Sequence, residues 1–355
     1  MAYQLGIDLG TTYTAAAVRR GVTVEICTLS PSNPVMPSVV ALRDDDEILV
    51  GEAAVRRAQV DPLRVAREFK RRLGDPAPLM LGRAPFSPEA LMGHLLRHVL
   101  DVVVAREGGQ PDQVVLTHPA NYGPYKLEMM REVARLGGVD LGRLRLLSEP
   151  QAAAISYSTR DRVEPGEHVA VYDFGGGTFD AAVLRKTADG FELVGQPEGL
   201  DRFGGIDVDA AIIDYVDHET DGALSALDQS DPVIAAGLQR MREDCRSAKE
   251  ALSSDSDTTL DVALPGVHRR VRITRKEIED IVRPRLRETT AALSRAITSA
   301  GLTTDDINRI LLVGGSSRIP LVPEMVARTL GRPVAVDAHP KFAVALGAAA
   351  LEGTH

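Results

Sequence analysis

Runs of apolar residues divide the chain into two halves that have a similar layout. Short segments rich in β-branched residues, or alternating between apolar and polar positions, predict strands, and glycines separate them. Three such strands open the first half at 3–9, 14–19 and 22–29, and three more follow at 168–173, 179–186 and 191–196. Each half therefore begins with three strands joined by tight turns.

Helices alternate with further strands after each set of three. Apolar positions at helical spacing, bounded by Gly, Pro and capping residues, predict helices at 52–59, 62–74, 88–106, 124–136, 150–158, 206–219, 232–252, 275–300, 321–330 and 342–351. The remaining strands are expected at 114–117, 144–147, 258–264, 269–273 and 310–313. The stretch "DPAPLMLGRAPFSP" is expected to be a loop, with Ser87 as the N-cap of the helix that follows.

This order predicts a duplicated α/β unit with mixed sheets and a cleft between two lobes. We expect lobe I at 1–165 and lobe II at 166–355. Lobe I has a shortened upper subdomain at about 30–90, and lobe II has an upper subdomain at about 207–300. A repeat of this length is too long for a solenoid, so a two-lobe duplication is the natural account.

The first turn of each half supports the duplication. The stretches "GIDLGTTYTAAAVRR" and "VYDFGGGTFDAAVLRK" align without a gap, so that Asp8 corresponds to Asp173 and Ala16 to Ala181, an offset of 165 residues. In both, a strand ends near an aspartate and a turn of small residues follows: Gly10, Thr11 and Thr12 in one, and Gly175, Gly176, Gly177 and Thr178 in the other.

Small residues in a turn suit an anion. A bare backbone lets N–H groups point at phosphate oxygens, and the threonine hydroxyls add donors. Two such turns facing each other across a cleft would hold a polyphosphate, and carboxylates beside it would require a hard cation, for which Mg2+ is the best candidate. A single glycine turn is equally typical of a tight hairpin, so only the pair of turns predicts a polyphosphate site.

Two further glycine-bearing segments lie at expected helix starts. They are "FGGID" at 203–207 and "LLVGGSSRIP" at 311–320, where Ser316 and Ser317 are expected to begin the helix. The guanidinium of Arg318 could stack on an aromatic base. Each segment taken alone is also explained as an ordinary helix cap.

Composition excludes several classes of partner. The chain has 355 residues with 41 basic and 50 acidic side chains, and its formal net charge of −9 gives no general reason to bind nucleic acid or an anionic membrane. No apolar run is long enough to insert into a membrane. The first residues do not resemble a signal peptide, and the two cysteines, Cys27 and Cys245, cannot form a disulfide framework, so we expect buried structural thiols in a cytoplasmic protein.

Five segments in order resemble a known family. "GIDLGTTYT", "SEPQAAA", "VYDFGGGTFD", "FGGID" and "LLVGGSSRIP" are similar to the nucleotide-binding domain of DnaK-type heat-shock chaperones, which belong to the actin, hexokinase and heat-shock ATPase superfamily. The resemblance covers 6 to about 351. It implies a duplicated actin-like (ribonuclease H-like) two-lobe ATPase fold that holds ATP or ADP with Mg2+ in a central nucleotide cleft.

The resemblance also implies roles for individual residues. Lys70, Glu149, Asp173 and Thr178 match catalytic positions, Asp8 and Asp173 would hold the metal through water, and Asp180 matches the second aspartate of the phosphate loop. The implied nucleotide-binding residues are Gly10, Thr11, Thr12, Tyr13, Gly175, Gly176, Gly177, Thr178, Gly204, Gly205, Arg246, Lys249, Glu250, Ser253, Gly314, Gly315, Ser316 and Arg318.

Some positions depart from the family pattern. Arg246 stands where an acid is usual, and Glu250 where an arginine normally stacks on the adenine, so we expect weaker or altered nucleotide affinity. Glu250 has the spacing to pair with Arg246 one turn back. Tyr13 replaces a usual asparagine, and Lys341 replaces a usual acid. At the proline-centred switch, Leu127 replaces the arginine that relays nucleotide state, which puts allosteric output in doubt.

Three functions remain open from the sequence, in addition to actin-like filament formation. The first is an ATP-binding, slowly hydrolysing domain of chaperone type with nucleotide-driven lobe closure, and the second is an ATP or ADP sensor or scaffold with little hydrolysis. A small-molecule kinase is the third, disfavoured by the short segment after Lys70. The interdomain linker and peptide-binding domain of the family do not follow "LEGTH", so we expect either a piece of a longer protein or an atypical, stand-alone or differently fused member. Its partners would be a co-chaperone, an exchange factor or a fused C-terminal region.

Overall fold

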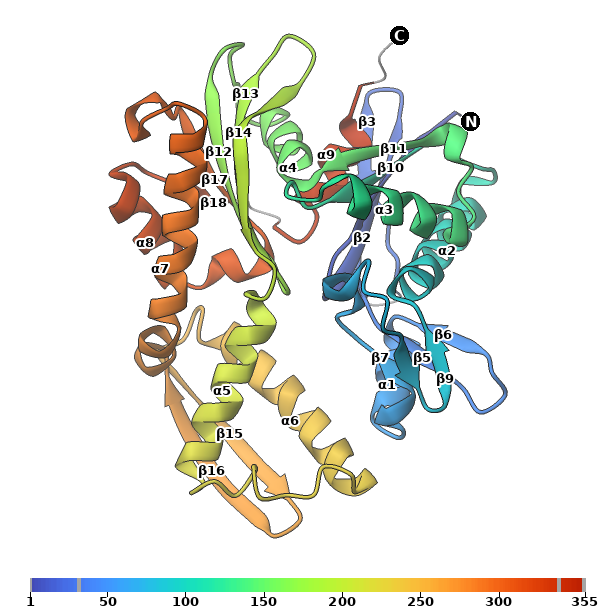
Figure 1. The fold of residues 1–355 in the computed structure, drawn as a ribbon, viewed down its shortest axis with the longest axis vertical. Coiled ribbons are helices and arrows are strands. Elements are labelled where there is room, and N and C mark those ends of the chain that lie inside the picture. The colour runs from blue at the N-terminus through green and yellow to red at the C-terminus, as the bar shows by residue number, and fades with distance from the viewer. Residues whose placement is uncertain (1, 31–32, 337–339, 353–355) are drawn as a thin grey trace.

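Two β-sheets with the same strand order form the centre of the protein (Figure 1). The computed structural model describes residues 2–30, 33–336 and 340–352. The first sheet has the order β3-β2-β1-β10-β11, with strands Gln4–Leu9 (β1), Tyr13–Arg20 (β2), Thr23–Ile26 (β3), Gln113–His118 (β10) and Leu144–Ser148 (β11). The second has the order β14-β13-β12-β17-β18, with strands His168–Phe174 (β12), Phe179–Lys186 (β13), Phe191–Leu200 (β14), Arg309–Val313 (β17) and Ala335–Val336 (β18).

The strand directions match as well. β1 is antiparallel to β2 and parallel to β10, and β12 is antiparallel to β13 and parallel to β17. On β12 alternate residues enter different apolar clusters: Tyr172 packs in the cluster that contains helix α7 (Arg275–Ser299), and Val171 in the one that contains helix α4 (Glu149–Ser158). Helices thus cover both faces of the sheet, which is why its strand is continuously apolar. The duplicated α/β layout predicted from the sequence is confirmed.

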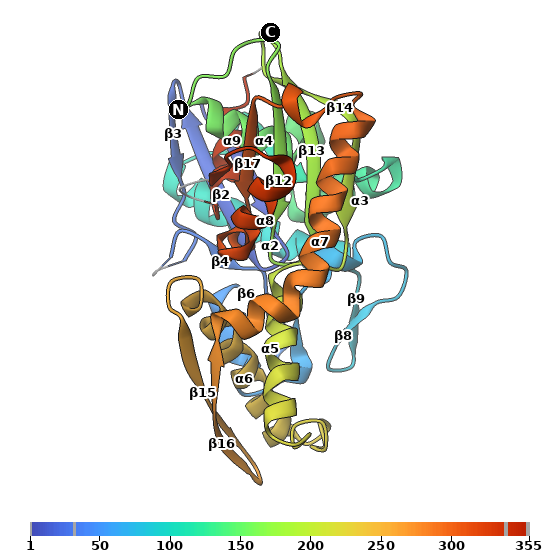
Figure 2. The same cartoon turned by 90° about the vertical axis from the view of Figure 1, so that its left-hand side faces the viewer.

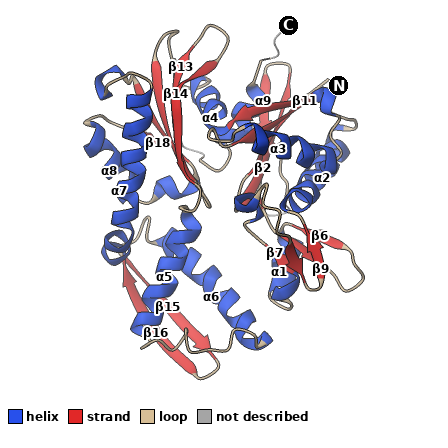
Figure 3. Cartoon of the chain, viewed as in Figure 1, coloured by secondary structure: helices blue, strands red, loops and turns tan. Residues whose placement is uncertain are grey.

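Within the described residues, six helices pack around the two sheets (Figure 3). They are Pro88–Glu107 (α2), Pro124–Gly137 (α3), Glu149–Ser158 (α4), Arg275–Ser299 (α7), Leu321–Leu330 (α8) and Ala343–Ala350 (α9). The predicted N-cap of α2 is confirmed, because the Ser87 hydroxyl accepts a hydrogen bond from the Ala90 backbone N–H at 3.1 Å.

The last helix lies against the first sheet although it follows the second in sequence. A Cβ on Gly6 of β1 would stand 2.2 Å from the Ala349 backbone nitrogen, and one on Gly347 would stand 1.7 Å from the Ala152 carbonyl oxygen of α4. The side-chain amide of Gln4 donates to the Ala348 carbonyl at 3.2 Å. Glycine permits this close packing of α9 between β1 and α4, and so the helix joins the two halves.

Two smaller units extend from the same end of the main sheets (Figure 2). The first contains Met36–Pro37 (β4, paired with β2), Val40–Leu42 (β5), Ile48–Val50 (β6), Glu52–Ala58 (α1), Val65–Ala66 (β7), Leu79–Leu81 (β8) and Ala84–Phe86 (β9). The second contains Gly205–Glu219 (α5), Pro232–Ala251 (α6), Asp257–Leu264 (β15) and Val267–Thr274 (β16).

The helix expected at 62–74 does not form. Short 3-10 turns at Pro62–Arg64 and Phe69–Arg72 flank β7 instead, and Glu68 between them has a left-handed backbone with φ of 58°. Ala66 pairs with Val40 of β5, so strand pairing replaces the helical hydrogen bonds that the spacing favours.

Two further expectations about local structure are also wrong. The loop expected at "DPAPLMLGRAPFSP" contains the β8–β9 hairpin, which turns at Gly82 with φ of 64°. Ser316 and Ser317 do not begin the helix, because Gly315–Arg318 forms a separate 3-10 turn, and the helix Leu321–Leu330 has the bounds predicted from its apolar spacing.

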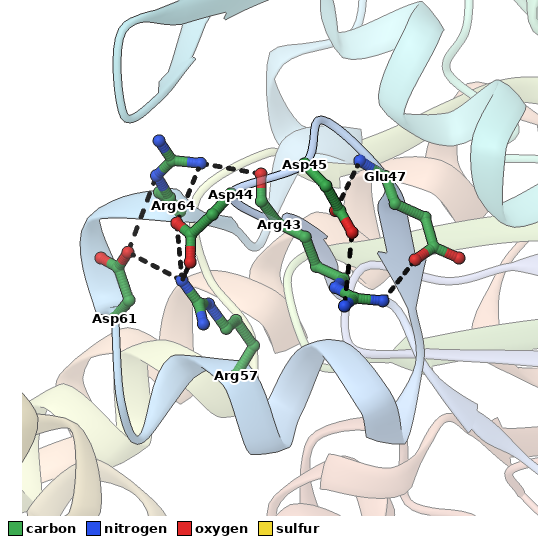
Figure 4. Close-up of polar contacts among 7 residues, drawn as sticks. All are labelled: Arg43, Asp44, Asp45, Glu47, Arg57, Asp61 and Arg64. Atoms are coloured by element: carbon green, nitrogen blue, oxygen red, sulfur yellow. Dashed lines mark hydrogen bonds and ion pairs between the residues drawn. The ribbon is translucent and has the colours of Figure 1, made fainter.

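Charged side chains hold the small β5–β6–α1 unit together (Figure 4). The Arg57 guanidinium of α1 pairs with Asp44 at 3.2 Å and with Asp61 at 3.3 Å. Arg64 approaches the same two carboxylates and donates to the Arg43 carbonyl at 2.8 Å. The apolar cluster beneath contains few residues, so this network supplements a small core.

Among the described residues, no helix combines the length and the apolar content that crossing a membrane requires.

Candidate functional site

The two glycine turns that the sequence singles out contact each other. A Cβ on Gly176 would stand 2.2 Å from the Thr12 hydroxyl oxygen, and one on Gly177 would stand 2.4 Å from the Thr11 methyl carbon. Both turns come directly from the central hairpins, β1–β2 and β12–β13. Side chains at these two glycines would push the turns apart, so their absence is what lets the two sheets present their backbones side by side.

The third and fourth glycine segments support the second turn. The Gly205 backbone N–H at the start of α5 donates to the Gly175 carbonyl at 3.0 Å, and Ile206 donates to the Gly176 carbonyl at 2.8 Å. The Ser316 hydroxyl donates to the Gly175 carbonyl at 2.8 Å. These bonds occupy carbonyl oxygens of the turn and hold its backbone in place.

A buried ion pair lies next to the turns. The Lys70 ammonium donates to the Glu149 carboxylate at 2.7 Å, and both residues are only 7% exposed. Lys70 comes from the 3-10 turn after β7, whereas Glu149 is the first residue of α4, where the positive end of the helix dipole favours an acid. Burial lowers the pKa of Lys70, but the carboxylates of Glu149 and Asp8 outweigh burial and raise it overall.

Three aspartates crowd around this pair. Burial raises the pKa of Asp8 to about 7, Lys70 opposes the shift, and Glu149 adds to it. Burial and the charge of Glu149 likewise raise the pKa of Asp180 to about 7. Asp173 is raised for the same reasons, burial first, with Asp180 and Asp8 contributing. One lysine therefore faces several carboxylates, an excess of negative charge that an added cation would relieve.

The glycine turns, the Lys70–Glu149 pair, Asp8 and Asp173 line one cavity of about 550 Å³, a size typical of cofactor sites. Every residue to which the sequence analysis gave a nucleotide or catalytic role lines it, except Gly204, whose backbone packs against Gly177. Asp180 is buried beside the cavity and does not line it. The lining residues that the sequence analysis did not assign are Ile206, Asp209, Ser254, Ile319, Pro340, Lys341 and Val344.

Helix α6 forms a charged wall of the cavity. The Lys249 ammonium donates to the Gly205 carbonyl at 2.9 Å and pairs with Asp209 at 2.7 Å. The helical spacing would allow Glu250 to pair with Arg246. Instead, the Glu250 carboxylate lies 4.0 Å from the Lys341 ammonium. That contact brings together segments that are distant in sequence, which helical spacing cannot reveal.

Comparison with known sequences identifies the family. Residues 4–78 and 77–355 match the sequence profile described as Hsp70 protein. The chain belongs to the Hsp70 family. This assignment confirms both the resemblance to DnaK-type chaperones and the actin-like ATPase fold that the duplicated sheets indicated.

Similar curated proteins include three from Thermotoga. The proteins named "Chaperone protein DnaK" from Thermotoga petrophila, Thermotoga sp. (strain RQ2) and Thermotoga maritima are each 32% identical over 98% of this chain. The Hsp70 chain described here spans 58% of the length of each of these relatives.

One residue of this Hsp70 chain joins the two sides of the cleft without having been predicted. The Arg71 guanidinium donates to the Gly177 carbonyl at 2.7 Å and also contacts the Asp207 carboxylate at the start of α5. Its position directly after Lys70 was the only signal in the sequence. A clearer signal was present for Asp209, because this residue follows Gly205 by four positions and the two therefore lie on the same face of α5.

The histidine and the cysteines of this Hsp70 chain have local roles. The His118 ring hydrogen-bonds the neighbouring Pro119 carbonyl at 2.8 Å and stacks on Tyr122, so its contacts are those of a packing histidine. Cys27 and Cys245 are buried and unpaired, as predicted, and burial raises the pKa of Cys27 to about 11 and of Cys245 to about 12. Neither thiol is a reactive nucleophile.

Proposed function

We propose that this chain binds ATP together with Mg2+ and hydrolyses it slowly, with lobe closure coupled to the nucleotide. The observation that carries the proposal is the contact between the two glycine turns, Gly10–Thr12 and Gly175–Thr178, at a cavity that also contains the buried Lys70–Glu149 pair. A triphosphate is the ligand that matches backbone donors from two directions beside a lysine.

The phosphates would lie between the turns. Backbone N–H groups and the hydroxyls of Thr11, Thr12 and Thr178 are the available donors. The bonds from Gly205 and Ser316 to the Gly175 carbonyl fix the second turn before any ligand arrives, so little order is lost on binding.

Magnesium fits the carboxylates through water. The described residues contain no group of three or more His, Cys, Asp or Glu side chains arranged to hold a metal directly. Mg2+ commonly keeps several of its waters and binds phosphates, and Asp8 and Asp173 would accept hydrogen bonds from those waters. The ion would supply charge neutralisation at the phosphates, and the excess of buried carboxylates beside Lys70 is consistent with such a site.

Lys70 and Glu149 would carry the hydrolytic step. The Lys70 ammonium would stabilise the negative charge that grows on the transferred phosphoryl group as water forms a bond to phosphorus and the bond to ADP breaks. Glu149 holds Lys70 in place at 2.7 Å and would accept hydrogen bonds from water. Thr178, whose hydroxyl donates a hydrogen bond to the Asp180 carboxylate, would orient the same phosphate.

The other end of the nucleotide would lie along α6 and the β17–α8 connection. Lys249, Ser253, Gly314 and Gly315 are the proposed ribose and base contacts, with Arg318 stacking on the base. Glu250 stands where a second arginine would complete the stack, so we expect lower affinity than that of a family member with both arginines.

A sensor with little hydrolysis is the second candidate. The substitutions at Glu250 and Leu127 favour it, because the first weakens the base site and the second removes the charged relay at the proline switch. In either case the moving units would be residues 1–165 and 166–355, with upper subdomains at about 30–90 and 207–300. The chain spans 58% of the length of its relatives. We propose a co-chaperone, an exchange factor or a C-terminal region as its partners and the cytoplasm as its location.

Phosphate release tests the proposal. Purified protein is incubated with ATP and Mg2+, and the result expected is slow release above the buffer rate that disappears in Lys70→Ala while ATP still raises the melting temperature. A rise in melting temperature without release would favour the sensor. Release only in the presence of a sugar or another acceptor would favour a kinase. If ATP caused no phosphate release and no thermal shift, that result would contradict nucleotide binding.

A further inference from the structure

Three side chains meet at the cavity in a chain of contacts. The Lys341 ammonium lies 4.9 Å from the centre of the Tyr13 ring and 4.0 Å from a carboxylate oxygen of Glu250. All three residues line the same cavity as the glycine turns. A cation over an aromatic face and an ion pair are both attractive, so Lys341 connects the other two.

The contacts join opposite walls of the cleft. Tyr13 is the first residue of β2, directly after the Gly10–Thr12 turn of the first sheet. Glu250 belongs to α6, in the unit that extends from the second sheet. Lys341 lies just before α9, the helix that packs between β1 and α4. The link therefore ties the phosphate turn of one half to the outer unit of the other.

We infer that Tyr13, Lys341 and Glu250 form a latch that retains the bound nucleotide, and that opening the latch limits nucleotide release. This inference rests on the proposed function. Tyr13 adjoins the phosphate turn, and Glu250 adjoins Lys249 and Ser253 on the wall proposed for the ribose and base. A nucleotide that spans from the turn to α6 would therefore lie beside the link.

The central member of the latch is Lys341. Removing Lys341 breaks both contacts, whereas removing Glu250 breaks one, so the two changes are not additive. The Lys341 side chain is 36% exposed and that of Glu250 is 58% exposed, so each contact contributes modestly. We expect Lys341→Ala to speed release about three- to tenfold, and Glu250→Ala about two- to fivefold.

The experiment measures dissociation of MANT-ADP with Mg2+ by stopped flow, chased with unlabelled ADP. The variants are Lys341→Ala, Glu250→Ala, their double mutant, and the charge exchange Glu250→Lys with Lys341→Glu. The double mutant should release as fast as Lys341→Ala alone. The exchanged pair should be slower than Lys341→Ala because the ion pair is restored. Lys276→Ala, which removes an exposed lysine paired with Asp280 on α7, is the control and should match the wild type.

Each result supports or overturns either the latch or the proposed nucleotide binding. Release from Lys341→Ala at the wild-type rate, or fully additive effects of the two single changes, would overturn the latch while leaving nucleotide binding intact. Failure of the wild type to bind MANT-ADP or unlabelled ADP would overturn the proposed function instead, and the latch with it. Faster release in Lys341→Ala that the charge exchange partly reverses would support the latch over a simple loss of stability.

Discussion

At the scale of single residues, missing side chains matter as much as those present. A Cβ on Gly176 or Gly177 would collide with Thr12 or Thr11, so the contact between the two turns requires glycine at both positions. Some other glycines are not constrained in this way: a Cβ on Gly109 would meet no atom within 4 Å. The two kinds of glycine therefore predict different outcomes when they are replaced.

Gly176→Ala should weaken ATP binding about tenfold or more, which corresponds to about 1.4 kcal/mol. The added methyl group would stand 2.2 Å from the Thr12 hydroxyl and force the turns apart. Titration calorimetry measures the change, and Gly109→Ala is the matched control, with unchanged affinity. Equal affinity in Gly176→Ala and the wild type would show that the phosphates do not lie between the turns.

The Lys70–Glu149 pair predicts a stability effect that is separate from catalysis. Lys70→Met leaves the Glu149 carboxylate buried without its partner, and we expect a loss of about 3 kcal/mol in the free energy of unfolding without nucleotide. The double variant Lys70→Met with Glu149→Gln should recover part of this loss, because the Glu149 side chain then carries no buried charge that lacks its partner. Urea unfolding measures both, and a double variant less stable than Lys70→Met would contradict the account.

The residues of the site divide by how visible they were in the sequence. The turns, Lys70 and Glu149 stand in motifs, so the resemblance identified them. Lys341 was noticed only as a departure, and its contacts with Tyr13 and Glu250 depend on how the last helix packs. A pairing between residues so far apart in sequence has no periodicity to reveal it.

At the scale of elements, the strands and long helices follow the apolar pattern, and the short segments do not. The strand at Phe179–Lys186 and the helix at Leu321–Leu330 have the predicted bounds. The segment after α1 has helical spacing, yet Val65 and Ala66 pair with β5. A two-residue strand is too short for alternation to show, so tertiary pairing decides its structure.

The ion network on α1 predicts a local effect. Arg57→Ala removes the guanidinium that contacts Asp44 and Asp61, and we expect a loss of about 1 kcal/mol confined to β5 and β6, seen as faster amide hydrogen exchange. Arg56→Ala is the matched control, since this neighbour is 71% exposed with one ion pair at 3.9 Å. Equal exchange in the two variants would mean that the network contributes nothing.

The docking of α9 predicts a larger effect. Gly347→Ala places a Cβ 1.7 Å from the Ala152 carbonyl oxygen, so α9 must move away from α4, and we expect about 2–3 kcal/mol of destabilisation in urea unfolding. Gly109→Ala again controls for the change of glycine to alanine. If Gly347→Ala were as stable as this control, α9 would not be the close-packed link between the two halves.

At the scale of the whole molecule, duplication explains why the site lies where it does. The two sheets have the same strand order, and in each a turn of small residues connects the strands of the central hairpin. The two turns meet because α4 and α9 pack between the sheets. Arg71 and Lys341 then connect the two sides across the cavity. The cavity at this meeting point is where we propose that a nucleotide binds.

Calorimetric titration of the wild-type protein with ATP, in the presence and in the absence of Mg2+, tests the central claim most directly. The account predicts one binding site per chain, with tighter binding when Mg2+ is present, because the cation offsets the carboxylates beside the phosphates. Absence of binding heat together with an unchanged melting temperature would contradict it, as would binding that is indifferent both to Mg2+ and to the Gly176→Ala change.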